Sequence, residues 1–242
     1  NRGRQDKAAH PFETTFSVND VRITTRFETD NPLAMVFSTM HEAGHGMYEQ
    51  GVNPVYERTA LEGGVSLAVH ESQSRMWENL IGRSLPLWEH FFPKLKKIFP
   101  AQLDGVGLKA FYKAVNKVEP SLIRVNADEA TYNLHIMLRL EIEIAMVENK
   151  IDLKHLPEIW NTKMREYLGV TPPNDAQGVL QDIHWSAGLI GYFSTYALGN
   201  LVSAQLWEKI NKDIRNLDDQ IRAGKFDALL CCLRENIHHY GL

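Results

Sequence analysis

A short segment near residue 40 combines residue types that bind metals with one that moves protons. It reads His41-Glu42-Ala43-Gly44-His45. In a helix, residues four apart lie on the same face, so the two imidazoles can bind one Zn²⁺ ion together. Glu42 lies beside them, where it can reach a water at the metal without binding the metal itself. The segment therefore predicts a metal site with a carboxylate within reach of a water at the metal.

A catalytic zinc needs a third protein ligand and an open fourth position. The best candidate is Glu71, in the segment His70-Glu71-Ser72-Gln73. A second helix, antiparallel to the first, would bring this carboxylate next to the two imidazoles. Spacing alone leaves His70 and Glu78 as alternative ligands. Structural zinc sites usually recruit cysteine, and the two cysteines lie far away near the C-terminus, which favours a catalytic site.

Two expected helices position these residues. The first covers 32–50, because Asn31-Pro32 is a typical helix start and Gly51 a typical end. The second covers 65–81. Before them, apolar and polar residues alternate over 21–27, which predicts a half-buried strand, and 1–18 is expected to be an extended arm. Further helices are expected over 86–98, 106–116, 127–149, 155–168, 185–211 and 226–240. The fold is therefore expected to be mainly α, with a small β element near the N-terminus.

Composition excludes several classes of function. The chain has 26 Lys and Arg against 30 Asp and Glu, with no basic run, so a nucleic-acid partner is not expected. Residues 183–207 contain no charged side chain, but their many polar groups exclude a membrane span and favour a buried helix. The two cysteines are adjacent and cannot form a long-range disulfide, which favours a reducing, cytoplasmic location. The first residues lack an initiator Met and an apolar signal core, as expected for the interior of a longer protein.

Six short blocks in this chain resemble those of the carboxypeptidase Taq family of metallocarboxypeptidases. They occur in the same order and cover most of the chain. The blocks are His10–Phe12, Asp20–Thr24, His41–His45, His70–Gln73, Ile123–Asp128 and Gly178–Trp185.

The resemblance implies a fold, a reaction and a set of roles. The fold would be that of a helical zinc peptidase, with 1–242 as a single catalytic region in the C-terminal half of an enzyme of roughly 500 residues. The reaction would be the release of single C-terminal amino acids from peptides, with broad specificity. One zinc or cobalt ion per chain would be held by His41, His45 and Glu71, with Glu42 as general base. The full-length protein would form a homodimer.

A carboxypeptidase also needs a cation for the free carboxylate of its substrate. Arginine suits this role because its planar guanidinium binds a carboxylate through two parallel hydrogen bonds. Arg124 is the first choice, and Arg22 is the rival. The structural alternative is a salt bridge, of Arg124 with Asp128 or of Arg22 with Asp20.

The oxyanion that develops during hydrolysis needs a hydrogen-bond donor. The segment 191–194 resembles the tyrosine-bearing helix of related zinc peptidyl dipeptidases, which favours Tyr192, and Tyr196 is the alternative. A packing role for both tyrosines is nearly as well supported.

Four other residues receive supporting roles. His184 is expected to bind the substrate backbone, and Asp182 to orient a histidine ligand from behind. His10 and Arg22 are expected to line the cleft, because an edge strand can pair with an extended peptide.

Two other functions remain open at this point. One is another peptidase with the same metal motif, either an aminopeptidase or an endopeptidase. The other is an inactive or incomplete fragment that binds metal or peptide without turnover.

Overall fold

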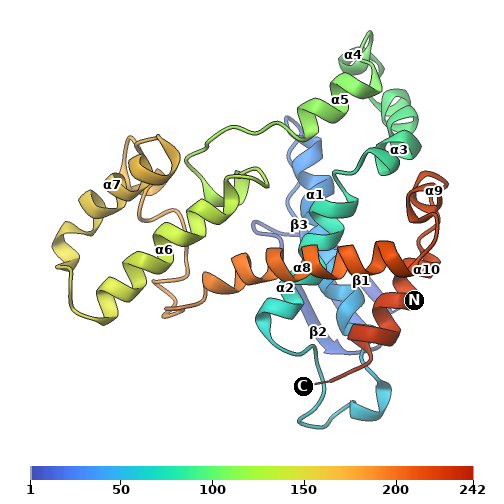
Figure 1. Cartoon of the computed structure of the whole chain (residues 1–242), viewed down its shortest axis with the longest axis horizontal. Helices are drawn as coiled ribbons and strands as arrows, with labels where there is room; N and C mark the ends of the chain where they lie inside the picture. Colours follow the sequence, from blue (N-terminus) through green and yellow to red (C-terminus); the bar gives the residue numbers. More distant parts are fainter. Residues whose placement is uncertain (1, 242) are drawn as a thin grey trace. The chain divides into compact units, whose positions relative to one another are not determined.

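A computed structural model describes residues 2–241, and these form two compact units. Unit 1 comprises the chain up to Val115 together with the chain from Gly199 onward, and unit 2 comprises 116–198. Helices dominate both units, so the expected mainly α fold is confirmed (Figure 1). No described helix has both the length and the apolar character needed to cross a bilayer.

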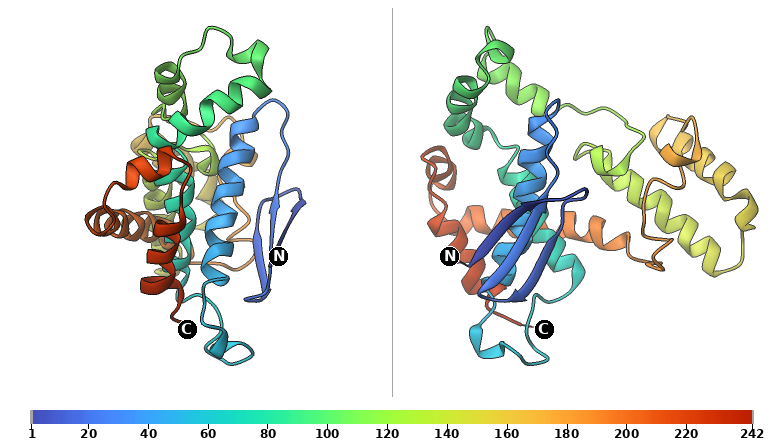
Figure 2. Two further views of the ribbon diagram at one scale, coloured as in Figure 1. Left: turned by 90° about the vertical axis from the view of Figure 1, so that its right-hand side faces the viewer. Right: turned by 180° about the vertical axis from the view of Figure 1, so that it is seen from behind.

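A three-stranded sheet covers one side of the first helix in unit 1 (Figure 2). Its strands are β1 (Gly3–Lys7), β2 (Glu13–Ser17) and β3 (Asp20–Thr25), in the order β1-β3-β2. Strand β3 is the expected strand, and it pairs in parallel with β1 and antiparallel with β2. The prediction of an extended arm over 1–18 is wrong, because this segment contributes strands β1 and β2 to the sheet. Strand β1 contains no apolar residue and is mostly exposed, so it has no alternating pattern to detect.

The two helices that carry the metal motif form as expected. Helix α1 (Pro32–Glu49) is capped by the Asn31 side chain, which accepts a hydrogen bond of 3.2 Å from the Ala34 amide. Helix α2 (Leu67–Arg75) continues directly into a π-helical turn, Met76–Ile81.

Helices α1 and α2 approach each other closely at Gly44. A Cβ atom at Gly44 would lie 2.6 Å from the Ser74 Cα and 2.7 Å from the Gln73 carbonyl oxygen. Both contacts are with backbone, which cannot swing aside as a side chain can. Only glycine therefore allows the second helix to lie this close to the metal motif.

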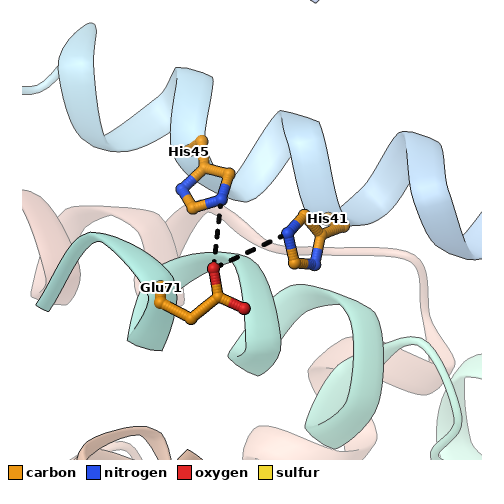
Figure 3. A group of neighbouring side chains, drawn as sticks. All are labelled: His41, His45 and Glu71. Atoms are coloured by element: carbon orange, nitrogen blue, oxygen red, sulfur yellow. Dashed lines mark ion pairs between the residues drawn. The ribbon is translucent and has the colours of Figure 1, made fainter. Parts of the chain in front are cut away.

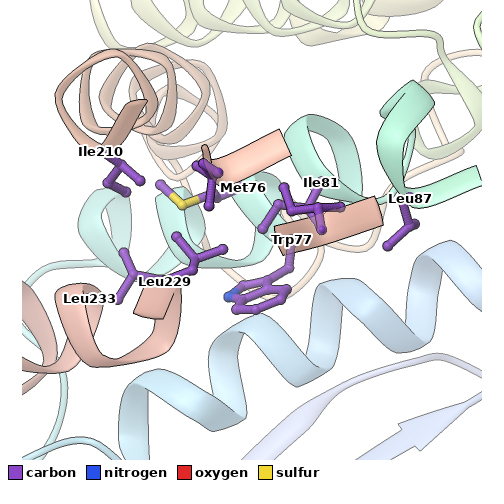
Figure 4. Packing of buried hydrophobic residues seen from close by; sticks show 9 residues of the cluster. Met76, Trp77, Ile81, Leu87, Ile210, Leu229 and Leu233 are labelled. Carbon is purple, nitrogen blue, oxygen red and sulfur yellow. The ribbon is translucent and has the colours of Figure 1, made fainter. Parts of the chain in front are cut away.

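The rest of unit 1 is helical. Its elements are α3 (Leu85–Ile98), α4 (Pro100–Leu103), α5 (Leu108–Val115), α9 (Leu217–Arg222), α10 (Asp227–Leu233) with the π-helical turn Arg234–His238, and most of α8 (Ser194–Asp213). The π-helical turn after α2 packs against α8, α9 and α10 in a core that holds Met76, Trp77, Ile81, Leu87, Ile210, Leu217, Ile221, Leu229 and Leu233 (Figure 4). This core anchors the turn that continues α2, and Met40 and Met47 of α1 also pack against it.

The helix expected over 185–211 is shorter and less buried than predicted. Helix α8 begins only at Ser194, and the residues before it form turns. Gly188 and Gly191 have φ of 75° and 85°, a left-handed conformation that a regular helix does not contain. Within α8 the buried residues are Gly199, Ser203 and Ile210, so the buried helix expected from the lack of charge is wrong.

Unit 2 is built on α6 (Tyr132–Val147) and α7 (Leu156–Leu168), which pack side by side (Figure 1). Its main core contains Leu138, Ile142, Trp160, Met164, Leu168 and Val179. A smaller aromatic cluster, formed by Tyr132, Ile136 and Phe193 with Trp185 and Tyr196 against it, lies at the start of α6.

We predict that Gly44→Ala destabilises the protein by about 1–3 kcal/mol, because the added methyl group overpacks the contact between α1 and α2. A loss of stability would be informative, because replacing glycine by alanine inside a helix otherwise raises the free energy of unfolding by roughly 1 kcal/mol. Urea unfolding measures the change. Gly107→Ala is the matched control, because nothing lies within 4 Å of a Cβ at that position. Equal stability of the two variants would contradict the close approach.

Candidate metal centre

His41, His45 and Glu71 come together between α1 and α2 (Figure 3). One ligand atom from each lies within 4.8 Å of the others. Nε2 of His41 is 3.8 Å from Oε2 of Glu71, and Nε2 of His45 is 3.5 Å from the same oxygen. The predicted ligand set is therefore one cluster, with both Nε2 atoms directed at the carboxylate.

This donor set fits a divalent metal. Zinc bonds of about 2.0–2.1 Å in a tetrahedron place donor atoms about 3.3 Å apart, close to the two observed separations. Two imidazoles and one carboxylate are also a known ligand set of catalytic zinc, and the same nitrogen and oxygen donors suit cobalt.

His41 is held from behind by a carboxylate. Its Nδ1 donates a hydrogen bond of 2.8 Å to Oε2 of Glu78, which also accepts one of 3.1 Å from Arg75. Burial disfavours the charged imidazole, but Glu71, Glu78 and Glu42 outweigh burial and raise the pKa of His41 to about 9. A proton on Nε2 thus faces Glu71 in the metal-free protein, at the position that a metal would take.

His45 is held from behind by a second histidine. Its Nδ1 lies 2.6 Å from Nδ1 of His70, and Nε2 of His70 lies 2.7 Å from Oε1 of Glu49. His70 and Glu78, the alternative ligands left open by spacing, therefore contact the imidazoles on the side away from the donor cluster. Sequence reasoning missed Glu49, although its position four residues after His45 on one helix face was a usable signal.

Glu42 is buried beside the cluster, with 7% of its surface exposed. Burial, and then repulsion from the carboxylates of Glu71 and Glu78, raise the pKa of Glu42 to about 7, although His41 acts in the opposite direction. A carboxyl group with this pKa can both accept and return a proton near neutral pH.

Arg124 lies in unit 2 and is buried in an ionic network. Its Nε and Nη2 donate to Oδ1 of Asp182 at 3.1 and 2.8 Å, and its Nη1 donates to the Tyr132 hydroxyl at 2.7 Å. Oδ2 of Asp182 accepts a hydrogen bond of 2.8 Å from Arg139. The salt bridge of Arg124 is thus with Asp182 and not with Asp128, whose oxygens accept from residues 119, 130 and 131.

Asp182, which the sequence predicted to orient a histidine from behind, lies within this network. Both of its carboxylate oxygens are engaged by arginines of its own unit, whereas the imidazoles of His41 and His45 bond to Glu78 and His70. The carboxylate that bonds to His41 is Glu78, and Asp182 forms ion pairs with two buried guanidinium groups.

His184, Tyr192 and Tyr196 form one aromatic group in unit 2. Nε2 of His184 is 3.0 Å from the Tyr196 hydroxyl, and its ring centroid is 5.2 Å from that of Tyr192. The rings of Tyr192 and Tyr196 are 5.4 Å apart. The two tyrosines that sequence left as alternatives thus flank the same histidine.

Arg22 lies on strand β3 of unit 1, and His10 lies in the bend between β1 and β2. A Cβ at Gly46 of α1 would touch Val21 and Ile23, so these residues face α1 and Arg22, between them, faces away from it. Arg22 pairs with Asp20 at 2.7 Å, as the structural alternative predicted. The His10 side chain is exposed, and its Nδ1 contacts the carbonyl oxygen of the neighbouring Pro11. Neither side chain joins the metal cluster.

Comparison with known proteins agrees with this geometry. The model of the carboxypeptidase Taq (M32) metallopeptidase family matches residues 1–242. Thermostable carboxypeptidase 1 of Thermus thermophilus is 50% identical over 99% of this chain and 47% of its own length, and carboxypeptidase 1 of Bacillus subtilis is 43% identical over 99% and 48%.

Solved structures give the same result. The M32 carboxypeptidase of Deinococcus radiodurans has a TM-score of 0.96 at 45% identity, and the carboxypeptidase of Pyrococcus furiosus has 0.96 at 46%. Each match covers 99% of this chain and 48% of the other. The chain thus spans about half the length of the relatives it matches. The family resemblance seen in the sequence is confirmed: the chain belongs to the carboxypeptidase Taq family of metallopeptidases.

Proposed function

We propose that this chain carries the catalytic centre of a metal-dependent carboxypeptidase that releases single C-terminal amino acids from peptides. The observation that carries the proposal is the donor cluster itself: two imidazoles with partnered Nδ1 atoms face one buried carboxylate, and Glu42 lies beside them. Family membership supports the same reaction. We further propose that 1–242 acts as a single catalytic region within a longer enzyme.

In this proposal His41, His45 and Glu71 hold one divalent metal ion, zinc or cobalt. When bound, the metal would supply Lewis-acid activation of the attacking water and of the scissile carbonyl. Glu42 accepts the proton of the attacking water on its carboxylate and passes it to the leaving amine. Its buried position keeps bulk water from competing for that proton.

Arg124 is proposed to bind the substrate carboxylate. A guanidinium has five N–H donors, and three of those of Arg124 are used by Asp182 and Tyr132. Two guanidinium groups around the single carboxylate of Asp182 leave one net positive charge in a buried network. Such a charge suits the free carboxylate of a peptide and disfavours the free amine that an aminopeptidase would bind.

Several finer features stay predictions. They are broad specificity, a cytoplasmic location, a homodimer of the full-length protein, and contacts of His184, His10 and Arg22 with the substrate. An incomplete fragment that binds metal or peptide without turnover is the alternative to the proposed activity.

Mass spectrometry of a short peptide, with a free or an amidated C-terminus, tests the reaction in metal-loaded protein. We expect stepwise loss of single residues from the free acid alone. Glu42→Gln should lower the rate by about 10²–10⁴-fold, because the general base is lost, while bound metal is retained. The exposed substitution Glu129→Gln is the control. Internal cleavage, N-terminal trimming, or bound metal without any cleavage would contradict the proposal.

Kinetic measurements can distinguish the roles of Tyr192 and Tyr196. Loss of an oxyanion donor lowers kcat by about 10²–10³-fold, and we expect this effect in Tyr192→Phe. Tyr196→Phe removes the hydrogen bond to His184 and should act mainly on KM. Steady-state kinetics on one tripeptide give both constants. A large fall in kcat for Tyr196→Phe alone would reverse the assignment.

Asp182→Asn should destabilise the protein by about 3–5 kcal/mol, because it leaves two buried guanidinium groups without a counter-charge. Burial raises the pKa of Asp182, but Arg139 and Arg124 outweigh burial and lower the pKa overall. The Asp182 carboxylate therefore stabilises the folded protein fully at pH values above the ordinary pKa of aspartate. This stabilisation is lost as the pH falls through the lowered pKa of Asp182 in the folded protein.

Urea unfolding as a function of pH measures both effects, with the exposed substitution Glu166→Gln as control. A wild-type-like stability of Asp182→Asn at pH 7 would contradict the role of this carboxylate.

A further inference from the structure

We infer that His70 and Glu49 fix the protonation pattern of the His45 imidazole and so act as positioning residues of the metal centre. The inference rests on the proposed role of His45 as a ligand. It starts from an unbroken series of side chains: Glu49 contacts His70 at 2.7 Å, His70 contacts His45 at 2.6 Å, and His45 faces Glu71 at 3.5 Å.

The direction of each hydrogen bond follows from Glu49. An ionised carboxylate only accepts, so Nε2 of His70 must carry the proton that bonds to it. Burial raises the pKa of Glu49, but hydrogen bonds from His70 and from the Gly64 amide outweigh burial and lower it overall, so the carboxylate is ionised at neutral pH.

His70 then determines the state of His45. A neutral imidazole with a proton on Nε2 has a lone pair on Nδ1, and that atom accepts from the Nδ1–H of His45. His45 therefore keeps its lone pair on Nε2, against the attraction of the Glu71 carboxylate, which lies 3.5 Å away and would accept a proton from that atom. This is the tautomer that binds a metal at Nε2.

The series is held rigidly. Oε1 of Glu49 also accepts a hydrogen bond of 3.1 Å from the Gly64 amide. A Cβ at Gly64 would lie 2.6 Å from the Tyr48 ring and 3.0 Å from the His70 ring, so the chain packs directly on the imidazole. The Tyr48 ring lies 5.1 Å from His70 on the same side, and its hydroxyl accepts a bond of 2.9 Å from the Val65 amide.

The two metal-binding histidines thus differ in their support. His41 bonds directly to Glu78, whereas His45 reaches a carboxylate only through a second imidazole. A merely structural role for His70 and Glu49, tying residues 64–65 to α1, is the alternative. The Tyr48 hydroxyl makes such a structural tie, because it accepts a hydrogen bond from the Val65 amide. Tyr48→Phe removes this tie but keeps the ring that packs beside His70, so it is the matched control.

Nitrogen NMR of the histidine rings in the metal-free protein tests the inference without any variant. Long-range ¹⁵N–¹H correlations distinguish a proton on Nδ1 from one on Nε2. We expect His45 to carry its proton on Nδ1 and His70 on Nε2. A proton on Nε2 of neutral His45 would overturn the inference.

Zn²⁺ affinity, measured by competition with a chelator, tests it a second way. We expect Glu49→Gln and His70→Phe each to weaken binding by about 10–100-fold, and the double variant to lose no more than the worse single one. Tyr48→Phe should lower the melting temperature but leave affinity within twofold. Unchanged affinity in the first two variants, or an equal loss in Tyr48→Phe, would overturn the inference. Absence of Zn²⁺ binding by the wild-type protein would instead refute the proposed function, and the NMR result would still decide the tautomer.

Discussion

The close packing of α1 against α2 is the constraint on which the metal centre depends. Gly44 lets the backbone of α2 lie against α1, and this places the carboxylate of Glu71 opposite the two imidazoles. A second glycine acts from the other side, since a Cβ at Gly199 of α8 would lie 2.7 Å from Cγ of Glu71. Helix α8 thus packs directly on the side chain of Glu71, whose carboxylate faces His41 and His45 of α1.

Close packing also concentrates negative charge. Glu42 and Glu71 are buried, and Glu78 is half-buried, around His41 and His45. The Arg75 guanidinium bonds to Glu71 at 3.0 Å and to Glu78 at 3.1 Å. This imbalance affects the pKa of two neighbouring groups. Attraction raises the pKa of His41, and burial with repulsion raises that of Glu42. A divalent cation would offset the excess charge, so folding itself prepares the site to bind one.

Much of this arrangement could be predicted from the sequence, because local signals specify it. The spacing of His41 and His45, the cap at Asn31 and the acidic and histidine side chains of the next helix predicted where the cluster lies, and the family resemblance selected Glu71. Strand β1 escaped prediction because an exposed edge strand needs no apolar alternation. The start of α8 was misplaced because low charge in a segment does not reveal a left-handed glycine.

The supporting groups could not be predicted, because they depend on contacts between distant parts of the chain. Asp182 is 58 residues from Arg124, and no local pattern indicates which of several acids meets that guanidinium. The direction of the bonds from Glu49 to His45 likewise follows from which ring nitrogen faces which partner, and only tertiary structure determines that. Spacing placed His70 and Glu78 near the donor cluster. It could not distinguish a residue of that cluster from a residue that hydrogen-bonds to it from behind.

Anomalous diffraction at the zinc edge, from crystals of this chain soaked in Zn²⁺, tests the central claim most directly. The account predicts one peak per chain, bounded by Nε2 of His41, Nε2 of His45 and a carboxylate oxygen of Glu71. No peak at this position, or a peak ligated by His70 or Glu78 in place of these residues, would contradict it.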